Sequence, residues 1–437
     1  MKPIYKFLLS SLDAFGHINF TLGFGELLVE AGHEVTFTHR DRYAAMATKR
    51  GFKFIPFDES FFANQSTAVF LEWTKKNLSK FRSDALTRYS NWSEADKELY
   101  SSVVDEYEPT NKALAAVLKE HKDSFDVLIA DYVTRFPALF SSPIPYIHLA
   151  SINPLSIYPQ GPPPFSGYST KLDEETYAKF KQVYDGACIR FKEKLFAWWK
   201  EYNTEPLPED NYFVDIPKHL GFYHYPEALD YSECGPKITD KWIRVDANIR
   251  KPDFEETFTV PETLENLPGK LIYFSLGSLG SIDVELMKEV IAILAQAPHR
   301  FIVSKGPLGF QIDLPSNMWG EDYVNQIAIL KVVDLVITHG GNNTFMETLY
   351  FGKPLIVLPF FFDQFDNAQR VVDCGIGRRL DTWKLDNETL LKAIEETLAD
   401  KEMQTKINAI SKSMQSADSG KKAVKMIEDF VEKLKAK

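Results

Sequence analysis

The sequence is poor in cysteine and has no cluster of basic residues. Its three cysteines among 437 residues are widely spaced and odd in number, so they form neither a disulfide framework nor a set of metal ligands. We expect Cys188, Cys234 and Cys374 to be small buried groups in a reducing compartment. Acidic residues outnumber lysine and arginine by 61 to 50, and the net charge is −11. This balance argues against a nucleic-acid partner, because such affinity depends mainly on neutralising phosphates.

Membrane-targeting signals are also missing. The most apolar stretch, 354–362, has about half of the ~18 residues that cross a bilayer, and it contains two prolines. The N-terminal apolar run is too short for a signal peptide and is followed by no clear cleavage site, so it fits a first strand better. We therefore expect a cytoplasmic, monomeric protein that has no membrane partner.

Apolar residues make up 44% of the chain and aromatic residues 14%, which is typical of a folded protein with a substantial core. The first half alternates between strand and helix patterns. The patterns predict a loop over 13–17, a helix over Ile18–Ala31 that Gly32 ends, and strands over Tyr5–Ser10, Val35–Thr38, Phe125–Asp131 and Pro145–Leu149. Polar helical stretches near 65–120 and 170–205 are interpreted as insertions above the sheet.

The alternation weakens over 246–268, where prolines and acids show almost no periodicity, and then restarts. It predicts strands over Lys270–Ser275, Arg300–Ser304, Leu335–Thr338 and Pro354–Leu358, and helices over Asp283–Ala297, Asn343–Tyr350 and Asn367–Cys374. We therefore predict an α/β protein with an N-terminal domain over 1–245, a linker over 246–268 and a C-terminal domain over 269–417. The parallel sheets of the two domains would face each other across a cleft.

The most informative segment is the turn between the strand that ends at Thr338 and the helix that follows. Gly340 and Gly341 allow a ligand to approach the backbone closely. The free N–H groups of the helix start attract an anion, and the side chains of His339 and Thr344 add hydrogen-bond donors. This combination suits a diphosphate.

Polar residues around the turn suit the rest of a nucleotide sugar. Glu347 lies on the helix, where its carboxylate can accept hydrogen bonds from two ribose hydroxyls. The pair Asp363–Gln364 follows a buried strand and offers acceptors and a donor to vicinal hydroxyls. Tyr323, three residues before Gln326, offers a flat face for a base, and backbone groups beside it can read the base edge.

This constellation resembles the donor motif of the family 1 UDP-glycosyltransferases, which runs from an aromatic residue and a glutamine through T-H-x-G-x-N-[ST]-x-x-E to D-Q. The spacing from His339 to Glu347 and to Asp363–Gln364 is that of the family. Ile272–Ser278 resembles the family's strand-plus-serine segment, and the opening Gly16–His17 matches as well. Asn342 stands where plant members often have tryptophan, next to the sugar, so the identity of the hexose stays open.

The resemblance implies the GT-B fold, in which two Rossmann-like domains face each other across a cleft. It also implies that a C-terminal helix over 418–437 packs back on the N-terminal domain. Ser278 would meet the β-phosphate, and the donor contacts would further include Gly16, Val324, Asn342 and Asn343.

By the same resemblance, His17 is the general base and Asp131 is the carboxylate that orients it. An ordinary histidine pKa near ~6.5 allows proton uptake at neutral pH. Asp126 lies on the same predicted strand and is the alternative to Asp131. The mechanism implied is attack on the anomeric carbon with inversion. It requires no metal or other cofactor, and the sequence contains no Asp-x-Asp pair of the kind that metal-dependent sugar transferases use.

The predicted function is transfer of a hexose, most simply glucose from UDP-glucose, to a hydroxyl of an apolar small molecule such as a flavonoid, phenolic, macrolide or xenobiotic, in a detoxification role. Candidate acceptor contacts are Phe15, Phe136, Tyr158 and Phe165, because small-molecule sites are mostly apolar. Two alternatives remain at this point. One is a non-catalytic GT-B protein that binds a nucleotide sugar or a lipophilic ligand, and the other is a nucleotide-sugar epimerase.

Overall fold

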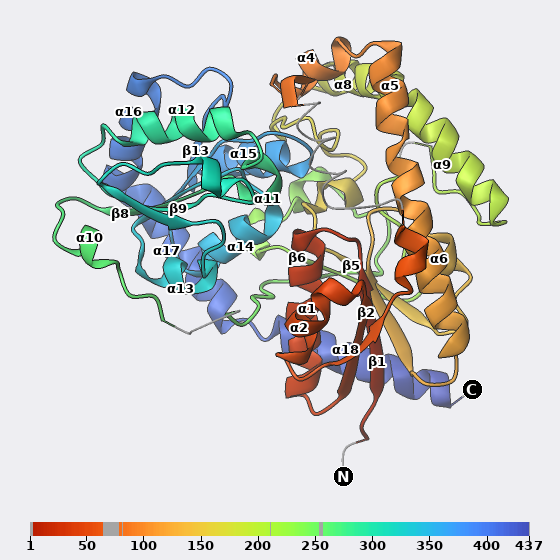
Figure 1. Cartoon of the computed structure of the whole chain (residues 1–437). Coiled ribbons are helices and arrows are strands. Elements are labelled where there is room, and N and C mark those ends of the chain that lie inside the picture. Colours follow the sequence, from red (N-terminus) through yellow and green to blue (C-terminus); the bar gives the residue numbers. More distant parts are fainter. Residues whose placement is uncertain (1–2, 64–77, 81, 210, 253–256, 437) are drawn as a thin grey trace.

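The computed structural model describes residues 3–63, 78–80, 82–209, 211–252 and 257–436. Two separate parallel sheets, each flanked by helices, form two α/β domains that lie beside each other (Figure 1). This arrangement confirms the predicted fold class.

The first sheet has seven parallel strands in the order β3-β2-β1-β4-β5-β6-β7. Successive strands are added on one side of β1 up to β3 and on its other side from β4 onward. The carboxyl ends of β1 and β4 therefore border the crevice where doubly wound sheets bind ligands. The four strands predicted here are present to within two residues. The strands are β1 (Lys6–Ser11), β2 (Glu34–His39), β3 (Lys53–Pro56), β4 (Val127–Asp131), β5 (Tyr146–Ala150), β6 (Gly221–His224) and β7 (Trp242–Val245).

Helices cover both faces of this sheet and extend above it, where α4, α5, α8 and α9 form a separate layer (Figure 1). The upper layer corresponds to part of the predicted insertions, in which residues 65–77 and 81 lie outside the described part. The prediction is wrong for 103–120, a helix whose Leu114 and Leu118 pack in one core cluster with Leu8 and Leu128 of the sheet. The helices of this half are α1 (Phe15–Glu30), α2 (Ala44–Thr48), α4 (Ala85–Ser90), α5 (Glu94–Ser101), α6 (Val103–Glu120), α7 (Pro137–Phe140), α8 (Glu174–Ala187) and α9 (Ile189–Glu201).

The predicted loop over 13–17 is wrong, because α1 begins at Phe15 and places His17 in its first turn. No side chain caps this helix, whose N-cap residue is Ala14. Asp13 has the chemistry of a cap, but its carboxylate instead accepts hydrogen bonds from Arg42 and Tyr43. The sequence therefore carries no capping signal at the true helix start.

The second sheet has six parallel strands in the order β10-β9-β8-β11-β12-β13, the doubly wound order of dinucleotide-binding domains. The strands are β8 (Leu271–Ser275), β9 (Arg300–Ser304), β10 (Met318–Glu321), β11 (Leu335–Thr338), β12 (Leu355–Val357) and β13 (Gly377–Arg379). Its helices are α11 (Gly277–Gly280), α12 (Val284–Leu294), α13 (Gln326–Val332), α14 (Asn342–Tyr350), α15 (Asp363–Cys374), α16 (Asn387–Ala399) and α17 (Lys401–Ser416). Helix α15 begins four residues before its predicted start, so Asp363 and Gln364 lie in its first turn.

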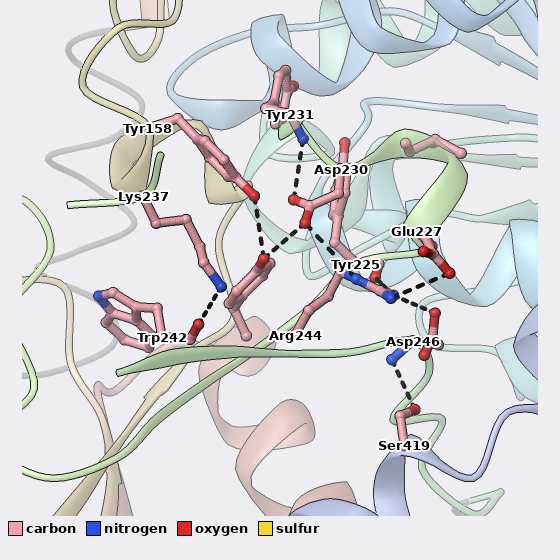
Figure 2. A network of polar contacts seen from close by, with 12 residues as sticks. Tyr158, Tyr225, Glu227, Asp230, Tyr231, Lys237, Trp242, Arg244, Asp246 and Ser419 are labelled. Atoms are coloured by element: carbon pink, nitrogen blue, oxygen red, sulfur yellow. Dashed lines mark hydrogen bonds and ion pairs between the residues drawn. The ribbon is translucent and has the colours of Figure 1, made fainter. Parts of the chain in front are cut away.

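The chain crosses between the domains twice. The outward crossing follows β7 and includes the short helix α10 (Glu262–Glu265), and the return leads into α18 (Ser419–Lys435), which packs under the first sheet (Figure 1). The two crossings touch where the backbone N–H of Asp246 donates to Ser419 Oγ at 3.0 Å (Figure 2). Arg244 bonds the carboxylate of Asp246 and lies near those of Glu227 and Asp230. A charged network thus joins both crossings to the edge of the first sheet.

Helix α18 presents an apolar stripe that includes Val424, Ile427 and Val431 to the core around α1 and β1. Its Glu428 accepts a hydrogen bond from His33 Nε2 at 2.9 Å. Of the helices in the described ranges, none is long and apolar enough to cross a bilayer.

Candidate active site

The first component of the site is His17, in the first turn of α1. Its Nδ1 lies 3.0 Å from Asp131 Oδ2, at the carboxyl end of β4, and 2.9 Å from Ser151 Oγ, just after β5. The side chains of His17 and Asp131 are 12% and 2% exposed. An imidazole that donates from Nδ1 to the carboxylate keeps Nε2 as its basic nitrogen. The structure therefore brings together the two residues predicted as the catalytic pair.

Two opposing effects act on the pKa of His17. Burial lowers it, whereas the charge and hydrogen bond of Asp131, and more weakly the charge of Asp363, raise it. The net result is a pKa above the ordinary value. A base with such a pKa holds a proton well once it has taken one, which is what proton abstraction from a hydroxyl demands.

Asp126, the alternative to Asp131, lies outside the site. It precedes β4 and accepts the backbone N–H of Lys6 at 2.8 Å, while its other oxygen pairs with Lys435 of α18. The two aspartates are therefore at opposite ends of the same strand, and only Asp131 reaches His17.

The second component is the turn between β11 and α14. The imidazole of His339 packs between two glycines, because a Cβ on Gly277 or Gly341 would come within 2.5 Å or 2.4 Å of the ring. Burial lowers the pKa of His339 to about 4, although a hydrogen bond with the backbone of Ser275 opposes this effect. His339 is therefore a neutral hydrogen-bonding group near neutral pH. Ser278 lies half-buried in the adjacent short helix α11.

The start of α14 contacts the N-terminal domain directly. Asn342 Nδ2 donates to the carbonyl of Ser151 at 2.8 Å, and Asn343 Nδ2 donates to the carbonyl of Gly16 at 2.6 Å. The start of α14, which is the predicted anion site, and the turn that carries His17 are thus neighbours. Gly16 belongs to this contact between the domains, and both asparagine amides, predicted as donor contacts, are engaged in it.

Further along α14, Glu347 is at the centre of a polar cluster. Its Oε2 accepts from Gln326 Nε2 at 2.5 Å, and its Oε1 lies 3.3 Å from Nε of Arg250. Gln326 is itself fixed, because its Oε1 accepts from the hydroxyl of Tyr273 and its Nε2 also reaches Thr344 Oγ1 at 3.3 Å. The structure therefore joins three predicted donor residues, Gln326, Thr344 and Glu347.

The side chains of Asp363 and Gln364 have different hydrogen-bond partners. Asp363 Oδ2 accepts the backbone N–H of Asn153 at 3.0 Å and lies close enough to His17 to influence its pKa. Burial raises the pKa of Asp363 to about 6. Gln364 differs from the expectation, because its Oε1 accepts the backbone N–H groups of Phe360 and Phe361. Its carbonyl therefore shapes the loop before α15, and only its amide group remains to face a sugar.

Tyr323 and Val324 lie just before α13. The ring of Tyr323 is 54% exposed, as a base platform should be, and its centroid lies 6.3 Å from that of Phe15. Phe15 was predicted as an acceptor contact, but the structure places it beside the predicted base platform.

The other three predicted acceptor contacts separate into two groups. Phe136 is fully buried among Tyr107, Tyr132 and Trp198, so it belongs to the core and cannot touch an acceptor. Tyr158 and Phe165 line a cavity of about 680 Å³ in the N-terminal domain, bounded by the proline-rich loop 159–165, by α8 and by residues 211–213. Other aromatic walls of this cavity are Tyr177, Tyr184, Tyr212 and Phe213.

The hydroxyl of Tyr158 lies 3.4 Å from the hydroxyl of Tyr223, which donates to Asp230. Tyr158 and Asp230 both belong to the polar network of Figure 2. The ring of Tyr158 is consequently held as a cavity wall. Phe213 also lines a small pocket that His17 and Asp131 line, so the large cavity and this pocket share one wall.

Several residues of the site were not predicted. Ser151 and Asn153 follow β5. Their position at the carboxyl end of a central parallel strand could have predicted that they belong to the site. Arg250 lies in the linker and Asp366 in α15, and neither belongs to a motif. Asp366 accepts the backbone N–H groups of Phe165 at 2.7 Å and Gly167 at 2.9 Å, so α15 anchors the proline-rich loop of the other domain.

Among the described residues, no group of three or more histidine, cysteine or carboxylate side chains is placed to hold a metal ion. The three cysteines are unpaired. Cys188 and Cys234 are buried, and Cys374 is partly exposed.

Comparison with known proteins gives matches along the whole chain. Residues 312–425 match the glycosyltransferase family 28 C-terminal domain. The chain is 26% identical over 439 residues to the NDP-glycosyltransferase YjiC of Bacillus subtilis (strain 168), which covers 98% of both proteins. It is 24% identical over 446 residues to a sterol 3-beta-glucosyltransferase of Saccharomyces cerevisiae (strain YJM789), covering 98% of this chain but only 35% of that one.

Solved structures of glycosyltransferases also align along nearly the whole chain. The glycosyltransferase of kitacinnamycin aligns with a TM-score of 0.68 at 20% identity, over 98% of this chain and 99% of that one. The spinosyn rhamnosyltransferase SpnG, solved with thymidine diphosphate, aligns with a TM-score of 0.59 at 16% identity, over 97% of this chain and 100% of that one. The chain therefore has the GT-B fold, as predicted, and its similarity to glycosyltransferases extends over nearly its full length.

Proposed function

We propose that this protein is an inverting glycosyltransferase that transfers a hexose from a UDP-sugar, with UDP-glucose preferred, to a hydroxyl of an apolar small molecule. One observation carries the proposal. The buried His17–Asp131 pair lies beside the start of α14. There the side-chain amide of Asn343 donates a hydrogen bond to the carbonyl of Gly16, the residue before His17. A base and an anion site from two different domains thus meet at one place.

The proposed reaction starts at His17 Nε2, which takes the proton of the acceptor hydroxyl. The acceptor oxygen attacks the anomeric carbon from the face opposite the nucleotide, and the bond from that carbon to the diphosphate oxygen breaks. The configuration inverts, so that an α-linked donor yields a β-glycoside. Negative charge that develops on the leaving UDP is met by the N–H groups at the start of α14, by Ser278 and by neutral His339.

The 680 Å³ cavity is the proposed acceptor site. Its volume lies within the range of about 300–1,000 Å³ typical of small-molecule sites, and nearly half of its lining residues are aromatic or proline. Tyr158 and Phe165 keep their proposed acceptor roles, whereas Phe136 does not. A sterol is added to the phenolic acceptors considered above, because one match that covers 98% of this chain is to part of a sterol 3-beta-glucosyltransferase. A detoxification role remains part of this proposal.

The nucleotide needs a direct test, because one structural neighbour was solved with thymidine diphosphate. The experiment is mass-spectrometric detection of products from UDP-glucose, UDP-galactose, UDP-N-acetylglucosamine, UDP-glucuronate and TDP-glucose against flavonoid and sterol panels. His17→Ala is assayed in parallel, and EDTA is added to a duplicate series.

A mass gain of one hexose that is lost in His17→Ala and unaffected by EDTA supports the proposal and names the sugar. His17→Ala should still bind UDP, which shows that its donor domain is folded. Nucleotide binding without any product would favour the non-catalytic alternative, and conversion of the donor sugar without an acceptor would favour the epimerase.

A further inference from the structure

Among the residues that the structure describes, three residues other than glycine have a positive φ. They are Phe165 at +69°, Asn203 at +51° and Phe362 at +50°. Asn203 lies exposed just after α9, and asparagine tolerates this region. A phenylalanine there strains the backbone, and such strain persists only where the surrounding structure fixes it, most often at functional sites.

The surrounding structure fixes both phenylalanines. The carboxylate of Asp366 accepts the backbone N–H of Phe165 at 2.7 Å. The backbone N–H of Gln364 donates to the carbonyl of Phe361 at 3.3 Å, which closes a turn with Phe362 at its first central position. With φ +50° and ψ −140°, this position is close to that of a type II′ turn, where glycine is the usual residue. The chain thus has a bulky aromatic side chain where glycine would relax the turn.

The rings of these two phenylalanines meet between the domains. Phe165 belongs to the proline-rich loop of the N-terminal domain, and Phe362 directly precedes α15 of the donor domain. Their centroids are 5.7 Å apart, and the rings are nearly perpendicular, at 73°. Phe165 is 4% exposed, whereas Phe362 is 37% exposed. The ring of Phe165 therefore supports that of Phe362, and part of the Phe362 ring stays open to a ligand.

Phe362 connects the wall of the acceptor cavity with the donor residues. Phe165 lines the 680 Å³ cavity, whose lining residues all belong to the N-terminal domain. The residue after Phe362 is Asp363, which lies close enough to His17 to influence its pKa. An acceptor held in the cavity has to extend toward these two residues before its hydroxyl can react. Phe362 lies beside this route, on the side of the donor domain.

We propose that Phe362 is a specificity-determining residue whose ring contacts the acceptor and selects molecules with a flat aromatic ring system, such as a flavonoid. This inference rests on the proposed function of the cavity as the acceptor site. Aromatic rings stack or meet edge to face, so an exposed aromatic ring favours a flat aromatic partner over a flexible chain. The strained turn agrees with this role, because relaxing it with glycine would remove the ring.

The test measures steady-state kinetics with UDP-glucose and the flavonol quercetin. In Phe362→Gly, KM for quercetin should rise about ten-fold, because the aromatic contact is lost. KM for UDP-glucose should stay within about two-fold of the wild-type value, because the ring contacts the acceptor and not the donor. Phe362→Tyr, which keeps the ring, should retain both wild-type values.

Two further variants separate the ring from the backbone. Phe362→Ala also lacks the ring but keeps a Cβ at the positive φ. It should show the same rise in KM for quercetin and should unfold at a lower temperature than Phe362→Gly, because glycine adopts this conformation without strain. Asn203→Gly is the matched control, since it relaxes a positive φ at the surface, and it should leave both KM values unchanged.

The outcomes separate the two levels of the argument. If wild type forms no glycoside from quercetin, the proposed transfer to flavonoids fails and this inference fails with it. If wild type turns over and Phe362→Gly has the wild-type KM for quercetin, only the inference is overturned. An equal rise in KM for UDP-glucose would show that Phe362 acts through Asp363, which also overturns it. An alanine variant as stable as the glycine variant would mean that the position is not strained, and the reason to assign the ring a function would be gone.

Discussion

Replacement of Asp131 by asparagine should change the pH dependence of the reaction as well as its rate. Asp131 is 2% exposed and lies 3.0 Å from Nδ1 of His17, and its charge and hydrogen bond are the main effects that raise the pKa of His17. Asparagine keeps the shape but removes the charge. The burial of His17, which lowers its pKa, is unchanged.

The sign of the shift follows directly. The base is active when neutral, so kcat/KM falls as the pH drops through the pKa of His17. In wild type this acidic limb should lie above the ordinary histidine value of ~6.5, and in Asp131→Asn it should move to lower pH. Asp363 still contributes its charge, so the shift reflects only the Asp131 part of the interaction.

At pH values above the acidic limb, kcat/KM of Asp131→Asn should be lower than that of wild type by roughly 10²–10⁴-fold. The reason is that the asparagine amide can donate to Nδ1 of His17 and stabilise the wrong tautomer. The difference between wild type and variant should therefore be largest at alkaline pH and should narrow as the pH falls. A pH series of kcat/KM measures both quantities. Asp126→Asn, at the other end of β4, is the control and should leave the limb in place. A slower Asp131→Asn enzyme whose limb has not moved would show that Asp131 does not raise the pKa of His17.

Three further predictions concern the donor turn, the acceptor loop and metals. Gly277→Ala should lower the free energy of unfolding by about 1–3 kcal/mol and abolish UDP binding, since its φ is +69° and the new Cβ would meet His339. Gly186→Ala in α8 is the control, because a Cβ there meets nothing within 4 Å. It should raise the free energy of unfolding by up to ~1 kcal/mol, as measured by thermal unfolding. Asp366→Ala leaves the backbone N–H of Phe165 without its acceptor, and should raise KM for the acceptor several-fold at constant Kd for UDP. A matching loss of UDP affinity would contradict the anchoring role. EDTA should leave turnover unchanged, and a loss restored by Mg²⁺ would refute the metal-free mechanism.

Patterns that repeat along the chain were sufficient to predict the fold. Buried strands such as Arg300–Ser304 and Leu335–Thr338 were located to the residue, because a continuous apolar run ended by polar residues leaves little choice of boundary. Helix starts were less predictable. Helix α1 begins without a capping side chain, and α15 begins after Phe362, a non-glycine residue at a φ of +50°. Neither start carries the usual sequence signal.

The site shows the same division. Residues grouped in a motif, such as Gln326, Thr344 and Glu347, could be predicted together because short spacings on neighbouring elements bring them together. Ser151 and Arg250 could not, because each reaches the site through the packing of one domain or linker against another segment far away in sequence. Phe136 was predicted to contact the acceptor but lies in the core. An aromatic residue shortly after β4 fits the pattern of a pocket wall and that of a core residue equally well.

The motif residues also do more than a motif can state. Asn342, Asn343 and Asp363 are predicted to bind the donor, yet each also bonds a backbone group of the N-terminal domain. A sugar that recruits these side chains must share or replace such contacts. If these side chains bind the donor as predicted, the affinity for donor and the association of the two domains should be coupled through the same polar groups. A substitution at any of the three should change both, which no alignment of motif positions would reveal.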